Sequence, residues 1–236
     1  MPNEKEKEKK AAAAEGRRAS DRGRYGRLSR ERVLATALEV VDRDGLSGLS
    51  MRKLGAELGV EAMALYRYAS SKGDLLDGLV EAFCQELESD LDAEPRAADW
   101  KGELHRIALA THRVALRHPN MVPLLATRLL STPLARRPAA VLRSDERVLA
   151  LLHDAGLGGR RVVELHRAFT AWLLGYLLVE LRAMDDEPGE PDPAFRLGLH
   201  RMPAQEFPRL RATAVSLDGQ GGPGQLAAGL DALLGA

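Results

Sequence analysis

The stretch that decides the fold runs from Leu49 to Lys72 and has the sequence Leu-Ser-Met-Arg-Lys-Leu-Gly-Ala-Glu-Leu-Gly-Val-Glu-Ala-Met-Ala-Leu-Tyr-Arg-Tyr-Ala-Ser-Ser-Lys. Ser50 is a good N-cap for a first short helix, and Gly59 supplies a residue that ends this helix and lets the chain turn. A second short helix is predicted from about Glu61 to Tyr68. Because two such helices cross closely, the position four before the turn must be small, and it is Gly55. The stretch therefore predicts a helix-turn-helix.

The two predicted helices divide their side chains between a small core and an outer face. The core is formed by Leu54, Leu58, Val60 and Leu65. The outer face of the second helix carries Ala62, Met63, Ala64, Tyr66, Arg67 and Tyr68. This face is poor in acidic residues and rich in groups that contact bases or phosphates, which predicts a DNA-binding surface.

The same residues resemble a known family. The runs Ser-Met-Arg-Lys-Leu, Leu-Gly-Val, Ala-Leu-Tyr-Arg-Tyr and Lys-Gly-Asp-Leu-Leu-Asp are similar, without gaps, to the DNA-binding region of the TetR family of bacterial transcriptional repressors, over roughly residues 30 to 79. The later runs Arg-His-Pro-Asn-Met-Val-Pro-Leu-Leu, Leu-Leu-Gly-Tyr-Leu-Leu-Val-Glu and Gly-Leu-Asp-Ala-Leu-Leu resemble a tetracycline-repressor-type ligand-binding domain more loosely. The resemblance implies a ligand-released repressor of a palindromic operator.

The resemblance also implies a division of labour in the DNA-binding region, whose contact residues would be Arg52, Ala62, Met63, Ala64, Tyr66, Arg67, Tyr68 and Lys72. Arg52 and Lys72 correspond to clamps on the DNA backbone, and the two tyrosines to aromatic residues that contact phosphates. Packing against the first helix is the alternative for both tyrosines, and more so for Tyr68 than for Tyr66. Arg67 fits either a phosphate or a guanine edge. The Ala-Met-Ala run departs from the family because it has no hydrogen-bond donors, which suggests apolar contact with thymine methyl groups.

Composition and charge indicate a helical protein with two unlike halves. Of its 236 residues, 45% are hydrophobic and only 4% are aromatic, which favours an all-α fold over sheets. Residues 1 to 72 carry 16 Lys and Arg against 11 Asp and Glu, a net charge of +5. Residues 73 to 236 carry the other 18 Lys and Arg against 23 Asp and Glu, a net charge of −5. We therefore predict a basic tail over 1–27, a DNA-binding domain over 28–72 and a larger helical domain over 73–236. The tail is expected to be disordered, either as a solubilising segment or as an arm that contacts DNA.

The second domain is expected to bind a ligand and to dimerise. Its most apolar predicted helix, from about Arg160 to Met184, is apolar on more than one face, so a second subunit is expected to cover it. By resemblance, this helix and the last helix would form a four-helix bundle with their mates. A pocket for a small apolar effector would draw on Trp100, His105, His112, His166, Phe169, Trp172 and Tyr176. The two histidines at 105 and 112 share a helix face, yet a bound metal is not expected without nearby carboxylates.

The sequence argues against several other classes of protein. Cys84, the single cysteine, excludes an internal disulfide and fits a reducing, cytoplasmic compartment. The longest apolar run, from 171 to 179, is too short to span a membrane. No nucleophile with its base, carboxylate pair or phosphate loop is visible, so neither an enzyme nor a cofactor is predicted. The remaining alternative is an interaction or scaffold protein with a basic tail and no specific operator.

Overall fold

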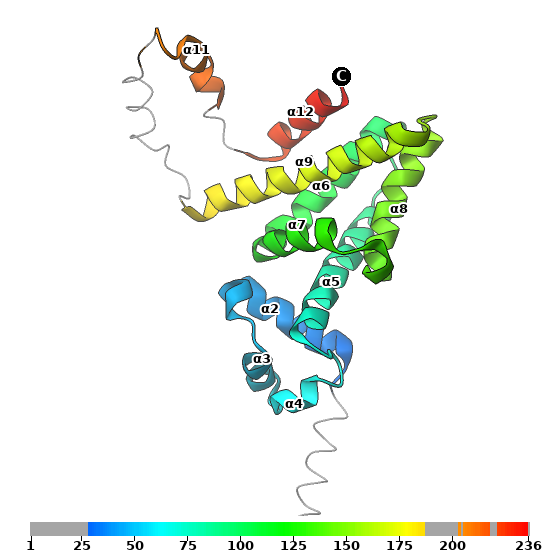
Figure 1. The fold of residues 1–236 in the computed structure, drawn as a ribbon, viewed down its shortest axis with the longest axis vertical. Helices are drawn as coiled ribbons and strands as arrows, with labels where there is room; N and C mark the ends of the chain where they lie inside the picture. Colours follow the sequence, from blue (N-terminus) through cyan, green and yellow to red (C-terminus); the bar gives the residue numbers. More distant parts are fainter. Residues whose placement is uncertain (1–27, 187–202, 204, 218–220, 236) are drawn as a thin grey trace, which may run out of the picture. The chain divides into compact units, whose positions relative to one another are not determined.

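The computed structural model describes residues 28–186, 203, 205–217 and 221–235, and every regular element within them is helical. The all-α prediction is thereby confirmed (Figure 1). The helices are α2 (Arg30–Gly48), α3 (Met51–Leu58), α4 (Ala62–Leu65), α5 (Lys72–Ala93), α6 (Trp100–Arg117), η1 (Pro119–Met121), α7 (Val122–Ser131), η2 (Leu134–Arg136), α8 (Ala139–Asp154), α9 (Gly159–Asp186), α11 (Pro208–Leu217) and α12 (Pro223–Leu234). The predicted basic tail and most of the acidic proline-rich stretch after α9 lie outside the described residues.

The chain divides into two units between Ala82 and Phe83, inside α5. The sequence placed the end of the DNA-binding domain at residue 72, before this helix. The first unit extends further because the beginning of α5 belongs to its core, where Leu75 and Leu79 are fully buried. Gly78 packs closely there, since a Cβ atom on it would lie 2.6 Å from the side chain of Leu34.

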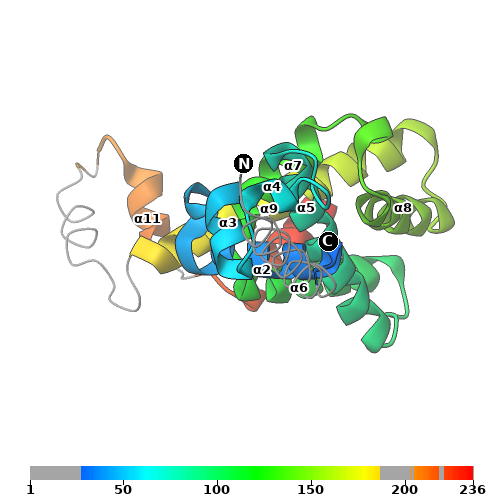
Figure 2. The ribbon, with the colours of Figure 1, turned by 90° about the horizontal axis from the view of Figure 1, so that it is seen from below.

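Local sequence signals place α2 and α3 in the first unit. The Ser29 hydroxyl accepts a hydrogen bond from the amide of Arg32, and the Ser50 hydroxyl accepts one from the amide of Lys53, so both serines are N-caps. Gly59 ends α3 with a φ of 67°, the left-handed conformation that favours glycine. A Cβ atom on Gly55 would lie 2.8 Å from the carbonyl oxygen of Val60, so only glycine fits where the two helices cross. Both views show α2, α3 and α4 side by side (Figures 1 and 2).

The second helix of the motif is shorter than the sequence predicts. It was expected to reach Tyr68, but α4 ends at Leu65 and residues 66 to 68 form a turn. The amides of Arg67 and Tyr68 donate to carbonyl groups three residues earlier, at 3.5 and 2.8 Å, in place of continuing the α-helical pattern. This tighter winding is common at helix ends. It brings the chain quickly from the exposed helix to the start of α5.

In the second unit, α9 contacts α6, α7, α8 and α12. Both views show α8 beside the beginning of α9 (Figures 1 and 2). The core between these helices is aliphatic, with Leu104, Leu125, Leu152, Leu177 and Leu226 fully or almost fully buried. α7 extends to Ser131, and α11 begins at Pro208. A turn precedes α11, in which the carbonyl oxygen of Pro203 accepts hydrogen bonds from the amides of Glu206 and Phe207.

Candidate nucleic-acid interface and ligand cavity

The turn after α4 and the starts of α3 and α5 expose a set of basic and aromatic side chains. Met63 is 77% exposed and Tyr66 is 46% exposed. Arg52, Arg67 and Lys72 are also exposed. Within the described part of the chain, the side chains of Tyr66 and of these three cations make no hydrogen bond or ion pair. Their charges and the phenol are therefore available to an external partner, and phosphate is the partner that matches them best.

The structure corrects the predicted orientation of Ala64, which is only 6% exposed. Its methyl group faces the core of the first unit because the helix is a single turn, in which Ala64 and Leu65 both point inward. Ala62 and Tyr68 are half-buried. Met63 is therefore the one fully outward member of the Ala-Met-Ala run, and the apolar part of the predicted DNA-contacting face is narrower than the sequence suggests.

Two polar anchors hold this surface in place. The guanidinium group of Arg30 donates to the carbonyl oxygen of Tyr68 at 2.8 Å, which fixes the turn after α4. The Ser71 hydroxyl accepts from the amide of Asp74 at 3.0 Å, and the Asp74 carboxylate accepts from the amide of Ser70 at 2.7 Å. This reciprocal cap starts α5 and positions the backbone of Lys72. The S-x-x-D pattern signals the cap, whereas nothing local pairs Arg30 with a carbonyl so far along the chain.

The second unit holds an apolar cavity of about 90 Å³ between α5, α6, α7, α8 and α9. Two of the predicted ligand-binding residues, His166 and Phe169, line it. The other lining residues are Phe83, Cys84, Leu87, Ile107, Thr111, Leu125, Leu129, Val141, Ser144, Asp145, Val148, Thr170, Leu173 and Leu174. Most of these side chains are apolar, so the cavity suits an apolar ligand with few polar groups.

One polar group on the cavity wall is held by charges. The Nε2 atom of His166 lies 3.3 Å from the Asp145 carboxylate, which also accepts from Arg137 at 2.7 Å. Burial opposes the charged form of Asp145, but these two partners outweigh it and lower the pKa of this carboxyl group below its ordinary value. The Asp145 carboxylate therefore fixes the orientation of His166 on the wall.

Four other predicted ligand-binding residues join helices and do not line the cavity. His105 on α6 lies 2.8 Å from Asp231 on α12, and His112 lies 2.9 Å from Glu180 on α9, with both side chains of the second pair buried. Tyr176 donates to the carbonyl oxygen of Gly222 at 2.9 Å, and burial together with Glu180 raises the pKa of its phenol. Trp172 packs between the rings of Phe169 and Tyr176. These contacts connect α6, α9 and α12.

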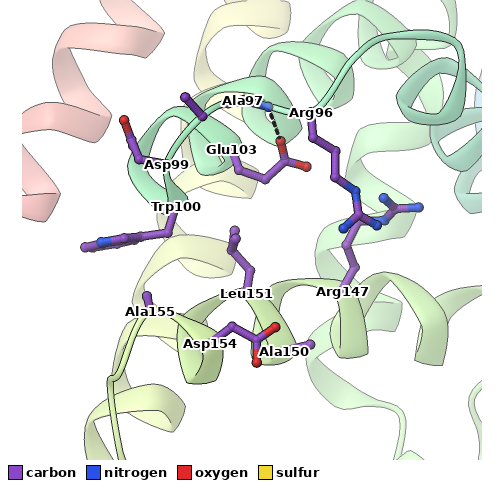
Figure 3. A pocket seen from close by; sticks show the side chains of 11 residues that line it. Arg96, Ala97, Asp99, Trp100, Glu103, Arg147, Ala150, Leu151, Asp154 and Ala155 are labelled. Carbon is purple, nitrogen blue, oxygen red and sulfur yellow. Dashed lines mark hydrogen bonds between the residues drawn. The ribbon is translucent and has the colours of Figure 1, made fainter.

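The last predicted ligand-binding residue, Trp100, lies on a separate hollow of about 490 Å³ at the start of α6 (Figure 3). In the sequence, Trp100 was grouped with the other six residues because all seven are polar or aromatic residues of the second domain. The structure therefore divides the seven predicted residues among a cavity, a helix junction and a second hollow.

Neither a metal site nor a membrane segment is indicated by the described residues. Among them, no three His, Cys, Asp or Glu side chains are grouped so as to hold a metal ion. One segment, Gly159–Leu181 in α9, is long and apolar enough to cross a membrane, with a mean hydropathy of 1.3. Core helices of globular proteins pass the same test, so this segment alone does not indicate a membrane protein.

Comparison with protein families matches both parts of the chain. Residues 33–79 match the family described as bacterial regulatory proteins, tetR family, and residues 93–234 match the tetracyclin repressor-like, C-terminal domain. The HTH-type transcriptional repressor DrrR1 of Streptomyces coeruleorubidus is 31% identical over 73% of this chain and 60% of its own length. An HTH-type transcriptional regulator of Saccharopolyspora erythraea is 32% identical over 65% of this chain and 61% of its own length. The chain thus spans about three fifths of the length of these two relatives.

Other similarities extend over more of the chain. The tetracycline repressor protein class C of Escherichia coli is 29% identical over 84% of both chains. The crystal structure of a possible TetR family transcriptional regulator from Streptomyces coelicolor A3(2) superposes with a TM-score of 0.71 at 27% identity, covering 88% of this chain and 97% of that one. A TetR variant from Acinetobacter baumannii AYE in complex with minocycline superposes with a TM-score of 0.61 at 25% identity, covering 88% of this chain and 92% of that one.

Proposed function

Because this chain belongs to the TetR family of bacterial regulatory proteins, we propose that it is a cytoplasmic, dimeric repressor that binds a palindromic DNA operator and is released by a small-molecule effector. It performs no catalysis in this role. The observation that carries the proposal is the exposed group of Arg52, Tyr66, Arg67 and Lys72, which has no partner within the described part of the chain. Unpaired cations beside a short exposed helix are what binding to a DNA groove requires.

Phosphate binding and base recognition are assigned to different residues of this surface. Arg52 and Lys72, at the starts of α3 and α5, grip the DNA backbone together with the phenol of Tyr66, and free amides at these helix starts favour phosphate. Met63 contacts thymine methyl groups. With the phenol of Tyr66 assigned to phosphate, Arg67 is the remaining exposed side chain of α4 and its turn that can donate hydrogen bonds to a base edge. Base recognition therefore depends mainly on Arg67.

Two DNA-binding units are needed for strong specificity, which requires a dimer with half-sites about 34 Å apart or a multiple of this distance. α9 supports this assembly because it remains partly uncovered in the single chain, with Val163 43% exposed and Val179 72% exposed. α12, which contacts α9, supplies the second helix of the interface. Size-exclusion chromatography with light scattering tests the proposal, and a strict monomer at micromolar concentration would contradict it.

Effector binding is assigned to the cavity lined by His166 and Phe169. A drug-sized molecule needs about 300 Å³ or more, so the cavity of about 90 Å³ must expand when the effector binds. Phe83, Cys84 and Leu87 of α5 form part of its wall, and the same helix begins with Lys72. An effector that binds the expanded form better shifts the population away from the DNA-binding form by an equal coupling free energy.

The effector proposal is tested with the complete protein and its operator. Selection from genomic fragments identifies the operator, and fluorescence anisotropy measures its release by a library of small hydrophobic compounds that includes minocycline. We expect compounds that raise the melting temperature of the protein to lower its affinity for DNA. If no compound changes either quantity, the effector proposal is wrong; if no fragment is bound sequence-specifically, the chain is a scaffold protein instead.

Arg52→Ala and Arg67→Ala are predicted to affect DNA binding in different ways. Arg52→Ala removes a phosphate contact, so it should weaken binding to all sequences and reduce the slope of log K against log salt concentration by about 1. Arg67→Ala should cost about 1–3 kcal/mol of binding free energy and relax the preference at one operator position. Anisotropy titrations over a set of single-base operator variants distinguish the two effects.

A matched control is Arg160→Ala, which removes an almost fully exposed cation from the second unit. We expect it to leave both the affinity for DNA and its salt dependence unchanged. The assignment of roles would be overturned if Arg52→Ala changed the preferred base, or if Arg67→Ala weakened binding to all DNA sequences equally.

A further inference from the structure

A hollow of about 490 Å³ lies between the chain leading into α6 and the last turns of α8, apart from the cavity assigned to the effector (Figure 3). Its volume falls within the usual range of small-molecule sites, about 300–1,000 Å³. The lining residues are Arg96, Ala97, Ala98, Asp99, Trp100, Glu103, Arg147, Ala150, Leu151, Asp154 and Ala155. None of them lines the smaller cavity.

One end of this hollow is lined by an indole ring and by aliphatic side chains. Trp100 lies on one side from α6, and Leu151 of α8 and Ala155, which follows α8, lie near it on the other side (Figure 3). Ala155 has a small side chain and lies near the indole, whereas Ala150 lies toward Arg147. An indole with aliphatic groups across from it favours a planar aromatic ligand, which gains both apolar burial and ring contact.

The other end is cationic. Figure 3 shows the side chains of Arg96 and Arg147 on the same side of the hollow. Arg147 is already paired with Glu88 at 2.5 Å and with the exposed Asp92 at 3.2 Å. Arg96 is exposed and makes no hydrogen bond or ion pair within the described part of the chain. Its guanidinium group is therefore free to bind an anion through two parallel hydrogen bonds.

The acidic side chains that border the hollow have other hydrogen-bond partners, although the charge of Glu103 also interacts with that of Arg96. Glu103 accepts two hydrogen bonds from Arg106, at 2.9 and 2.6 Å, and one from the amide of Ala97 at 2.9 Å, so its charge is satisfied internally. Asp99 accepts from the amide of Gly102 as the N-cap of α6. Asp154 is 82% exposed and interacts with His153. An anion beside Arg96 thus meets no unpaired buried carboxylate.

We propose that this hollow is a second small-molecule site that binds a planar aromatic carboxylate, with the ring beside Trp100 and the carboxylate on Arg96. The ring and the charge are recognised at opposite ends, so neither an aliphatic acid nor an uncharged aromatic compound satisfies both. The site does not depend on the proposed repressor function, because none of its residues belongs to the DNA-binding surface or to the effector cavity.

The two tryptophans of the chain provide an internal control for this proposal. Protein labelled with 5-fluorotryptophan gives one ¹⁹F resonance for Trp100 and one for Trp172, and Trp100→Phe assigns them. We expect 2-naphthoate, added up to about 5 mM, to shift the Trp100 resonance in a saturable way while the Trp172 resonance stays in place. An unchanged Trp100 resonance, or an equal shift of both, would overturn the proposal.

Arg96→Ala tests the charged end of the hollow. This variant should fold normally because the Arg96 side chain makes no hydrogen bond or ion pair within the described part of the chain. We expect it to weaken 2-naphthoate binding about five- to tenfold, as for a partly exposed charge-assisted hydrogen bond. The uncharged analogue 2-naphthamide should bind the wild type and Arg96→Ala equally. Arg160→Ala, on α9, should leave 2-naphthoate binding unchanged. If Arg96→Ala lost affinity for 2-naphthoate and for 2-naphthamide equally, recognition of the carboxylate by Arg96 would be contradicted.

Discussion

Gly55→Asn is expected to destabilise the first unit by roughly 3 kcal/mol and to abolish DNA binding, while the second unit stays folded. A Cβ atom at this position would lie 2.8 Å from the carbonyl oxygen of Val60 and 3.2 Å from the amide nitrogen of Ala62. Both are backbone atoms, one in the turn between α3 and α4 and the other at the start of α4, so no side-chain rotation can relieve the contact. The chain must move α4 away from α3, which displaces the DNA-binding surface.

The matched control is Gly59→Asn, four residues later at the end of α3. Gly59 has a φ of 67°, and a Cβ atom there would meet nothing within 4 Å. Asparagine adopts this left-handed conformation more readily than other side chains, so we expect a cost below about 1 kcal/mol and retained DNA binding. The pair separates a steric requirement for glycine from a conformational one.

Hydrogen exchange followed by mass spectrometry measures the two units separately. In Gly55→Asn, peptides covering α3 and α4 should lose protection, whereas peptides covering α9 should keep theirs. Tryptophan fluorescence supplies a second check, because both Trp100 and Trp172 lie in the second unit. Normal protection of α3 in Gly55→Asn, or loss of protection throughout the chain, would contradict the prediction.

Features that depend on neighbouring residues were predictable from the sequence. Ser29 and Ser50 cap their helices, and Gly55 and Gly59 shape the turn, because each acts on atoms within a few residues of itself. The end of α6 at Arg117 was also predictable, since a proline follows His118. These signals are sufficient to predict an all-α protein with a helix-turn-helix near its beginning.

Features that depend on distant partners were not predictable. The spacing of His105 and His112 places both on one face of α6, but it does not reveal that Asp231 and Glu180 bind them from other helices. A histidine with a carboxylate partner in the fold looks, in the sequence, like a candidate ligand-binding residue. In the same way, the burial of Ala64 depends on how one turn of α4 packs against its unit, which residue type alone does not determine.

Removing the carboxylate of Glu103 is expected to destabilise the second unit by about 3 kcal/mol. The Glu103 and Arg106 side chains are only 8% and 10% exposed, and two hydrogen bonds join them. Arg106 also donates to the carbonyl oxygen of Leu91 at 2.7 Å, so the pair joins the end of α5 to α6. Glu103→Ala leaves a nearly buried guanidinium group without its counter-charge and leaves the amide of Ala97 without its acceptor.

The control for this change is Glu94→Ala, which breaks the ion pair between Glu94 and Arg113. These side chains are 45% and 41% exposed, so water replaces the lost contact and the expected cost is below about 1 kcal/mol. Urea unfolding followed by tryptophan fluorescence measures both variants. If Glu103→Ala and Glu94→Ala lower the free energy of unfolding equally, burial does not make the ion pair between Glu103 and Arg106 more stabilising than the exposed pair.

The pH dependence of stability provides an independent test of the same pair. The hydrogen bonds from Arg106 lower the pKa of Glu103 below its usual 4.5, although burial acts in the opposite direction. A folded-state pKa below the unfolded value means that the pair stabilises fully above about pH 4.5 and loses this contribution as the pH falls through the folded pKa. Glu103→Gln keeps the shape and removes the charge, so its free energy of unfolding should approach that of the wild type between about pH 5 and pH 3. A constant difference over that range would show that the charge of Glu103 does not produce the stabilisation.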